Sequence, residues 1–420
     1  MGHGAAFSVS HFRNGKNAEI EAAVQNVPES LEEESRLDTV GTDQETERAA
    51  VREKKGQQEK EAGDTETDQA AAAQDELLAE LDFDAIQQEV DSLLSSQQFS
   101  FAGTVRSLLQ DGDPFRIFRA GNAVLSCAKT AFLAQKGLMK ELFLLVLAGA
   151  VLGSFSSLFE GKQVRDASFY MVYLLALALI LKNFQSSGEN LKAVITSLVA
   201  FMRILTPSYY LAAAAAGGAS SAVMFYQMLL LVILAVEKLL LALVLPMIHI
   251  YLLIALVNDL SGEEILSHMT ELLETCVNGL LKSSLGVLVG MQMIRNLIAP
   301  ALDSLRQMAL WRTAGMIPGI GNAVNAVTEL VAGSAVLIRN CFGVTAMLVL
   351  LAAGMVPAVQ LLVSGLSFRL LAAAAQPVSD KRIAGCLAAA GKGYAMLLRL
   401  LLTVEVLFLL TIAILAGTFS

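Results

Sequence analysis

The sequence predicts an all-α, polytopic membrane protein built as a bundle of transmembrane helices. Its composition points there, because 55% of the 420 residues are hydrophobic and only 16% are charged, whereas soluble proteins carry about 25% charged residues. The apolar residues also gather, from Leu142 onward, in blocks close to the length of about 20 residues that a helix needs to cross a bilayer. A water-soluble core has no use for so much apolar surface, so an ordinary soluble enzyme is excluded.

The acidic charge of the chain is confined to its N-terminal quarter. Residues 1–100 hold 23 Asp and Glu against 8 Lys and Arg, a net charge of −15, whereas residues 101–420 carry +6. Residues 1–75 have few large apolar side chains and cannot offset the entropy of ordering, so we predict a disordered acidic tail. Because residues 1–14 lack an apolar run of about 7–15 residues, we expect no secretory signal peptide.

Residues 76–140 are expected to form a helical region beside the membrane. Apolar residues recur at three- and four-residue steps from Leu77 to Leu94, and a second such run extends from Phe101 to Leu109. This spacing is typical of helices with one apolar face. Two arrangements stay open, a small helical cap packed on itself and interfacial helices that lie on lipid.

Residues 141–420 form the predicted transmembrane domain, with eight or nine apolar segments. Long apolar stretches favour helices, because a membrane barrel would show alternating segments of about 10 residues. The block from Ala222 to Val257 is too long for one span and contains Glu237 and Lys238, so we predict two helices or one broken helix. For Ile317–Ile338, which opens with Pro318 and Gly319, a re-entrant hairpin and a full span both stay open. The segments are Leu142–Phe159, Ala167–Leu181, Ala193–Gly217, Ala222–Val257, Cys276–Ile294, Ile317–Ile338, Val344–Phe368 and Tyr394–Phe419.

The charges between these segments predict a sidedness. Basic residues precede the first span and occupy residues 182–192, 295–316 and 369–393, whereas residues 258–275 are acidic and contain no Lys or Arg. Basic loops prefer the cytoplasmic side of a membrane. With nine spans, this rule puts the basic segments in the cytoplasm and the acidic segment on the opposite side.

Ionisable residues inside apolar segments are the strongest pointers to function in a membrane protein, because they are costly in hydrocarbon. Glu237 and Lys238 are adjacent, and Arg399 and Glu405 lie six residues apart, so neither pair can form along one helix face. These side chains either line a polar path or proton relay, or they reach toward the interface and fix helix packing. The residues concerned are Arg203, Glu237, Lys238, Lys282, Glu329, Arg399 and Glu405.

Small and helix-breaking residues indicate how the helices would meet. Gly286 and Gly290 have the GxxxG spacing that lets transmembrane helices approach closely. Prolines inside apolar blocks either kink helices or mark the discontinuous helices of transporters. They are Pro207, Pro246, Pro300, Pro318, Pro357 and Pro377.

Motifs for catalysis are missing from the sequence. HExxH, GxSxG and the Walker phosphate-binding spacing do not occur, and the four cysteines have no paired spacing. No basic stripe with interleaved aromatic residues indicates nucleic-acid binding. We therefore predict no enzymatic activity, no cofactor, no metal and no nucleic-acid partner.

Between residues 295 and 392, five short motifs follow one another in order. They are Leu302-Asp303-Ser304-Leu305, Ile317-Pro318-Gly319-Ile320-Gly321, Thr328-Glu329, Ala335-Val336-Leu337-Ile338-Arg339-Asn340 and Gln376-Pro377-Val378-Ser379-Asp380-Lys381-Arg382-Ile383. This series resembles the stage III sporulation protein AE family, polytopic membrane proteins of endospore-forming bacteria. The resemblance extends from about residue 80 to the C-terminus and excludes the acidic tail.

The resemblance implies a membrane subunit of a channel complex that is similar to secretion machinery, connects the mother cell to the forespore and supports late forespore development. It implies a place in the mother-cell-derived outer forespore membrane, with the other subunits of the stage III complex, the lipid bilayer and a homo-oligomer as expected partners. An autonomous secondary transporter with Glu237, Lys238 and Glu405 in its polar path is the alternative. The matched residues are candidates for channel or assembly contacts: Pro318, Gly319, Gly321, Glu329, Arg339, Asp380, Lys381 and Arg382.

Overall fold

A helical bundle forms the described part of the protein. The computed structural model describes residues 82–94, 99–111, 121–156, 162–215, 220–261, 266–314 and 321–417, and all of them belong to one compact unit. Helices make up nearly all of these ranges, and no strand occurs within them, so the all-α prediction is confirmed. The tail predicted for residues 1–75 lies outside the described residues.

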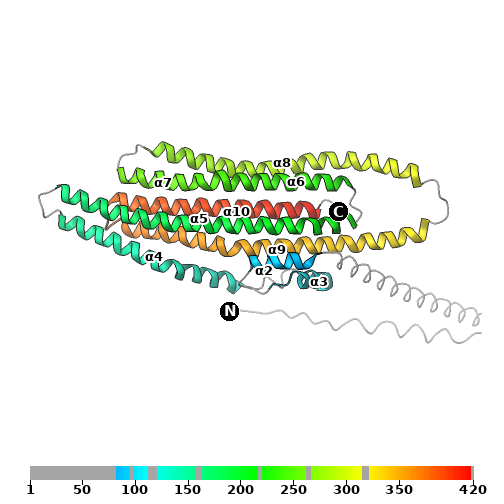
Figure 1. Ribbon diagram of the computed structural model, residues 1–420, viewed down its shortest axis with the longest axis horizontal. Coiled ribbons are helices and arrows are strands. Elements are labelled where there is room, and N and C mark those ends of the chain that lie inside the picture. Colours follow the sequence, from blue (N-terminus) through cyan, green and yellow to red (C-terminus); the bar gives the residue numbers. More distant parts are fainter. Residues whose placement is uncertain are drawn as a thin grey trace, which may run out of the picture. The chain divides into compact units, whose positions relative to one another are not determined.

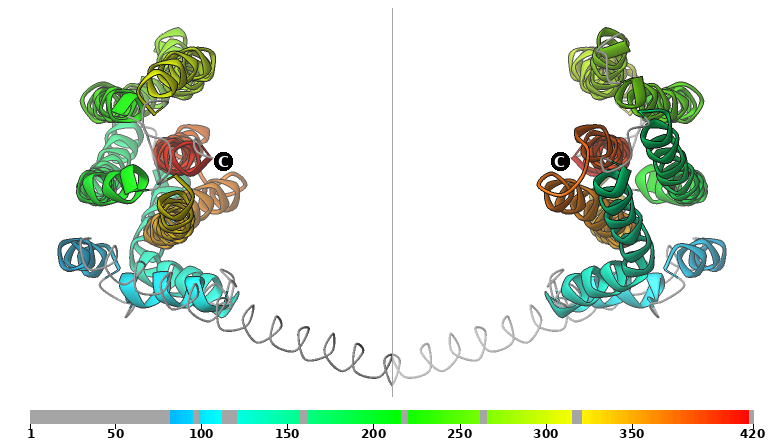
Figure 2. Two further views of the ribbon diagram at one scale, coloured as in Figure 1. Left: turned by 90° about the vertical axis from the view of Figure 1, so that its right-hand side faces the viewer. Right: turned by 90° about the vertical axis from the view of Figure 1, so that its left-hand side faces the viewer.

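Long helices that reverse direction at short connections build the bundle (Figure 1). Seen end-on, α10 occupies the centre (Figure 2), where it contacts α5, α7, α8 and α9. Its most apolar stretch is also the most buried of the candidate spans, at 56%. The helices are α4 (Gly121–Ser156), α5 (Lys162–Ala215), α6 (Ser220–Leu239), α7 (Leu245–Ser261), α8 (Ser267–Ala314), α9 (Gly321–Ala375) and α10 (Lys381–Gly417).

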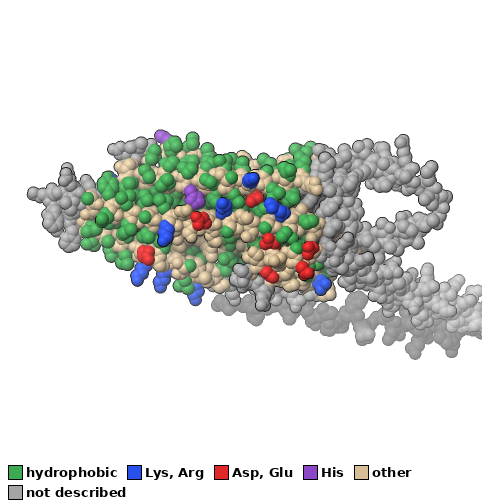
Figure 3. Space-filling view, viewed as in Figure 1, with side chains coloured by type: hydrophobic (Ala, Val, Ile, Leu, Met, Phe, Trp, Pro, Cys, Tyr) green, Lys and Arg blue, Asp and Glu red, His purple; other side chains and the backbone are tan. Residues whose placement is uncertain are grey.

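Five helices in the described ranges are long and apolar enough to cross a membrane, which makes this a multi-pass protein. Figure 3 shows hydrophobic side chains over much of the visible face, as expected for surfaces that meet lipid. Leu142–Phe159, which lies mostly in α4, is not among the five. The candidate spans are Ala167–Tyr209, Leu230–Ser261, Ser267–Ile294, Gly333–Ala375 and Lys381–Ile414.

Within the described ranges the candidate spans are fewer than the eight or nine predicted segments, in part because two helices join segments that the sequence analysis separated. α5 has 54 residues and runs through residues 182–192, which were expected to form a loop. α9 has 55 residues and joins the described part of Ile317–Ile338 to Val344–Phe368, so residues 321–338 form no re-entrant hairpin and no separate span. At about 1.5 Å per residue each helix is about 80 Å long, more than twice the thickness of about 30 Å of the hydrocarbon layer.

The polar stretch of α5 stays helical because its buried face continues through it. Phe184 and Leu191 are seven residues apart, and both are almost completely buried. The stretch contains no proline, so nothing removes a backbone hydrogen bond there.

The block from Ala222 to Val257 is one broken helix, which is one of the two alternatives that the sequence predicted. A π-helix at Leu240–Val244 separates α6 from α7, and the backbone N–H of Leu245 donates to the carbonyl of Leu240. Pro246, which follows Leu245, has no N–H of its own. The wider turn of the π-helix therefore lies where α-helical hydrogen bonding is already interrupted.

Two short amphipathic helices precede α4, as the periodicity predicted. Asp82 caps the first, α2 (Phe83–Leu93), by accepting a hydrogen bond from the backbone N–H of Ala85 at 3.1 Å. The rings of Phe83 and Phe101, the latter in α3 (Phe101–Asp111), lie 6.1 and 5.0 Å from that of Phe342 in α9. The apolar faces of α2 and α3 therefore pack against the bundle.

The acidic segment 258–275 and the basic segment 369–393 lie at the same end of the bundle, which disagrees with the predicted placement of these two segments on opposite sides. A Cβ atom on Gly385, near the start of α10, would lie 3.1 Å from the carboxylate of Asp259, near the end of α7. Glu274 of α8 also forms an ion pair with Lys392 of α10. The prediction failed because it depended on the number of spans, which the continuous α5 and α9 change. We call this end the Asp380 end, and the part of the bundle away from it, where α2 and α3 pack on α9 around Phe342, the Phe342 end.

Candidate functional site

Polar side chains from five helices gather along α10, from the buried Tyr394 to the exposed Lys392 and Arg399. They come from α5, α7, α8, α9 and α10, and hydrogen bonds, ring contacts or a shared cavity join them. We call this set the polar layer and treat it as the candidate site, because polar groups among transmembrane helices are costly unless they serve packing or function. Its members are Asn183, Ser187, His249, Glu274, Asn278, Gln360, Ser364, Lys392, Tyr394 and Arg399.

Tyr394 lies at the centre of the polar layer. Its hydroxyl accepts a hydrogen bond from the side-chain amide of Asn183 at 2.6 Å and lies 3.3 Å from the hydroxyl of Ser187. Its ring stacks on Phe368 of α9 at 5.2 Å and meets Phe184 of α5 edge-on, also at 5.2 Å. One side chain of α10 thus joins α5 and α9 through both its polar and its apolar parts.

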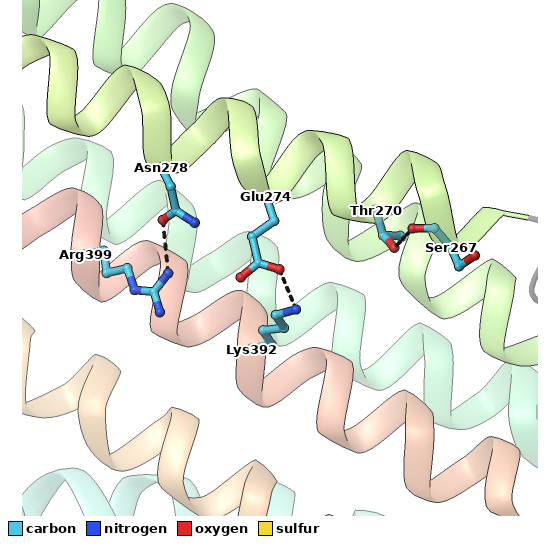
Figure 4. A network of polar contacts seen from close by, with 6 residues as sticks. All are labelled: Ser267, Thr270, Glu274, Asn278, Lys392 and Arg399. Carbon is cyan, nitrogen blue, oxygen red and sulfur yellow. Dashed lines mark hydrogen bonds and ion pairs between the residues drawn. The ribbon is translucent and has the colours of Figure 1, made fainter.

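Two polar contacts connect α8 to α10 at the edge of the polar layer (Figure 4). The ammonium of Lys392 lies 2.5 Å from the carboxylate of Glu274, and Arg399 donates to the side-chain oxygen of Asn278 at 3.0 Å. Lys392 also lies 5.9 Å from the centre of the Tyr251 ring. Lys392 and Arg399 of α10 therefore both have partners on α8.

His249 of α7 lies close to the backbone of α5. A Cβ on Gly188 would come within 2.6 Å of the imidazole, so only glycine allows this approach. The imidazole Nδ1 lies 2.9 Å from the carbonyl of Leu245, directly after the π-helix. The ring borders a groove of about 390 Å³ whose lining combines Leu253 and other apolar side chains with Glu189 and Lys192. Among the residues the structure describes, no group of three or more His, Cys, Asp or Glu could hold a metal.

Glu405 of α10 stands apart from the polar layer. It is 11 residues beyond Tyr394, a rise of about 16 Å along the helix. Its side chain is only 6% exposed, and it lies directly against Gly354 of α9. It is too far along the helix to pair with Arg399, as the sequence analysis expected.

Four other ionisable residues predicted inside apolar segments lie nearer the surface. Glu237 is half-buried and interacts electrostatically with Arg203 of α5 as well as with Lys238. Arg203, Lys238 and Lys282 are exposed. The structure thus brings Arg203 and Glu237 together and leaves Glu405 as the deeply buried member of the set within the described side chains.

The residues matched to the family lie in different places. Asp380 caps α10 by accepting from the backbone N–H of Arg382 at 3.0 Å, and the guanidinium of Arg382 lies 5.3 Å from the centre of the Phe169 ring of α5. Lys381 is exposed beside them, whereas Arg339 is 1% exposed inside the bundle. Gly321 begins α9, and Glu329 follows in the same helix with its side chain not described. Pro318 and Gly319 lie outside the described residues.

Several residues of the site escaped the sequence analysis. Tyr394 and Asn278 carry no charge, and Glu274 and Lys392 were assigned to loops. Residues 182–192 did carry a pattern that indicates the polar layer. Their polar side chains are spaced so that they lie on the same face of a helix as the buried apolar ones. The predicted GxxxG pair, Gly286 and Gly290, makes no close helix contact in the bundle, because a Cβ on either glycine would meet no atom within 4 Å.

Glycines elsewhere bring α9 and α10 together. A Cβ on Gly391 of α10 would lie 3.2 Å from the carbonyl oxygen of Gly365 in α9, and a Cβ on Gly365 would lie 3.3 Å from Tyr394. These two glycines face each other across the interface, so their spacing within one helix gives no sign of the contact.

Comparisons with known proteins agree with the series of motifs. A family model described as stage III sporulation protein AE matches residues 99–418, which is more than half of the chain. The stage III sporulation protein AE of Bacillus subtilis (strain 168) is 22% identical over 291 residues, which cover 69% of this chain and 73% of that protein. No solved structure matches. The matched range contains the whole polar layer and Glu405.

Proposed function

Because the chain belongs to the stage III sporulation protein AE family, we propose that it is a membrane subunit of the channel complex that connects the mother cell to the forespore. In this role it supports late forespore development from the mother-cell-derived outer forespore membrane. It acts as a structural and conduit subunit rather than as an enzyme. Its partners are the other subunits of the stage III complex.

The apolar surface of α8 carries this proposal. Only 22% of the most apolar stretch of α8 is buried, against 56% for α10. Large apolar side chains are exposed from Met269 to Leu297, a rise of about 42 Å, or about 40 Å at the average tilt of about 20°. This exceeds the hydrocarbon thickness of about 30 Å, so part of the surface needs a protein partner to cover it.

The unused GxxxG pair on the same helix supports a helical partner. Gly286 and Gly290 have open space where a side chain would begin. Helices from other subunits can approach such small residues closely. Among the residues matched to the family, the exposed Asp380 and Lys381 can also meet a partner, whereas Arg339 is buried inside the bundle.

A co-purification experiment in the native endospore-forming host tests the proposal. The full-length protein, tagged and expressed from its own promoter, is isolated from sporulating cells in mild detergent, and its partners are quantified by mass spectrometry. We expect other stage III membrane proteins to co-purify, and we expect Gly286→Leu with Gly290→Leu to lose them and to reduce spore yield. Gly137→Leu on α4, where a Cβ also meets nothing, is the matched control. Full partner recovery and normal sporulation in the double variant would contradict the proposal.

An autonomous secondary transporter is the second candidate, and the polar layer inside the bundle favours it. This candidate requires that the purified protein alone moves a solute across liposomes, and that Glu237, Lys238 and Glu405 lie on the path. The exposure of Lys238 speaks against a sealed internal route through it. Normal sporulation after neutralising all three side chains would remove this candidate.

A further inference from the structure

Glu405 is a buried carboxyl group at a position where only a glycine on the neighbouring helix leaves room for it. Its side chain is 94% buried, and its Oε1 atom has no hydrogen-bond partner among the described residues. It lies against Gly354 of α9 so closely that any Cβ there would overlap the carboxylate. We propose that Glu405 is a proton-binding site at the interface of α9 and α10, reached by water through a cavity beside Pro357.

The helices around Glu405 offer it no balancing positive charge. On α10 the nearest ionisable side chain is Arg399, which is turned toward Asn278 of α8. On α9 no ionisable residue lies between Cys341 and Arg369. A bare carboxylate in apolar surroundings costs several kcal/mol, and such groups usually take up a proton instead.

The remaining neighbours of α10 are equally free of charge over the same stretch. α5 has no ionisable residue between Lys192 and Arg203, and α8 has none between Lys282 and Arg295. α7 contributes only His249 up to Tyr251, and that imidazole contacts the carbonyl of Leu245 and the Phe184 ring at the level of the polar layer. Glu405 is therefore neutralised by what binds to it.

A small cavity beside the polar layer ends at the turn of α9 next to the one that holds Gly354. It has about 40 Å³ and lies between α5 and α9, lined by Ser187, Asn190, Gln360 and Ser364 among others. This is enough for water, which needs about 10–15 Å³ and polar partners. Pro357 borders the cavity and lies one helical turn from Gly354.

Pro357 also leaves a backbone carbonyl of α9 without its helical hydrogen bond. Proline has no backbone N–H, so the carbonyl of Ala353, four residues earlier, has no helical donor. The hydroxyl of Ser187 in turn contacts that of Tyr394. Hydroxyl and amide groups thus line the cavity beside the polar layer, and the carbonyl of Ala353 lies next to Gly354, against which Glu405 rests.

A proton fits this site better than a metal ion. Alkali and alkaline-earth ions take several oxygen ligands at once, whereas a single carboxyl group is available here and the space beside it depends on a glycine. One proton neutralises one carboxylate without requiring further ligands.

Labelling with dicyclohexylcarbodiimide tests the proposal directly. This apolar reagent modifies carboxyl groups that carry a proton in apolar surroundings. The full-length protein in lipid nanodiscs is treated across a pH series, and the modified residue is identified by peptide mass spectrometry. We expect labelling of Glu405 that rises as the pH falls and is lost completely in Glu405→Gln. Glu189→Gln, which changes an exposed carboxyl on α5, should leave this labelling unchanged.

Two results would overturn the assignment. One is the failure of Glu405 to react at every pH at which the protein stays folded. The other is suppression of labelling by sodium ions at constant pH, which would assign a cation site. Labelling of the wild-type protein remains a valid test even if Glu405→Gln does not fold. An infrared carboxylic-acid band that shifts in heavy water provides a second measure. Because neither measurement needs partner subunits or spores, each outcome is independent of the proposed role in the channel complex.

Discussion

The hydroxyl of Tyr394 connects α10 to α5, and because Tyr394 is buried, water cannot replace this contact freely. Tyr394→Phe keeps the ring but leaves the amide of Asn183 without its acceptor. We expect the free energy of unfolding to fall by about 1 kcal/mol, the usual value for such a hydrogen bond. Chemical unfolding in detergent micelles measures the loss. Tyr170→Phe, whose ring is 45% exposed, is the control and should be neutral; equal stability of both variants would show that the hydroxyl contributes nothing.

Gly354 gives a second test of residue-level packing. Gly354→Ala places a methyl group where the Glu405 carboxylate lies, so we expect a loss of about 1–3 kcal/mol, typical of overpacking. Adding Glu405→Ala frees the space and should recover most of the loss. Gly286→Ala meets no atom within 4 Å and should be neutral or stabilising by up to about 1 kcal/mol. Thermal unfolding of the four proteins decides, and a stable Gly354→Ala protein would contradict the close approach.

These two sites show how far the sequence reaches at this scale. Glu405 was found because it is an acidic residue in an apolar segment. Gly354 lies 51 residues earlier, and its role depends on the register of α9 against α10. Tyr394 opened an apolar segment, where nothing distinguishes a hydrogen-bonded tyrosine from a packing residue. The local sequence pattern therefore identifies an unusual residue but does not identify its partners on distant helices.

Local pattern predicted the helices well and their ends poorly. α2, α3 and the break after Glu237 and Lys238 follow from periodicity and charge. The polar residues 182–192 were expected to end a helix, but contacts with other helices satisfy them: Asn183 and Ser187 bond to Tyr394 while Phe184 packs on its ring. Tertiary contacts overrode local polarity, as they also did where α9 joins two expected segments.

The pairing of α8 with α10 can be tested at the scale of these elements. Lys392→Glu places a carboxylate opposite Glu274 and should weaken the contact, while the swap of Lys392→Glu with Glu274→Lys restores opposite charges. Because both side chains are partly exposed, we expect a coupling free energy of about 0.5–1 kcal/mol in a double-mutant cycle. Unfolding of the four proteins provides the cycle. A coupling of zero would mean that the two helices do not meet at this point.

Opposite charges gather at one end of the whole bundle. Asp259 and Glu274 lie beside the first turns of α10, which carry Lys381, Arg382 and Lys392. The basic and acidic segments therefore compensate each other locally. A rule that counts positive charge loop by loop could not detect this, because it needs the number of spans, and that number depends on which polar stretches remain helical.

Cysteine accessibility tests the arrangement of the whole molecule. In a protein whose four native cysteines are replaced, Glu271→Cys on α8 and Lys381→Cys on α10 should react with a membrane-impermeant maleimide from the same side of the membrane, since both exposed residues lie at the Asp380 end. Arg106→Cys on α3 should react only from the other side, because α3 packs at the Phe342 end of α9. The apolar segment Val344–Phe368 separates the two ends. Labelling after denaturation serves as the control for reactivity. Reaction of Glu271→Cys and Lys381→Cys from opposite sides would rule out the ion pair between Glu274 and Lys392, and with it the antiparallel bundle that brings the polar layer together.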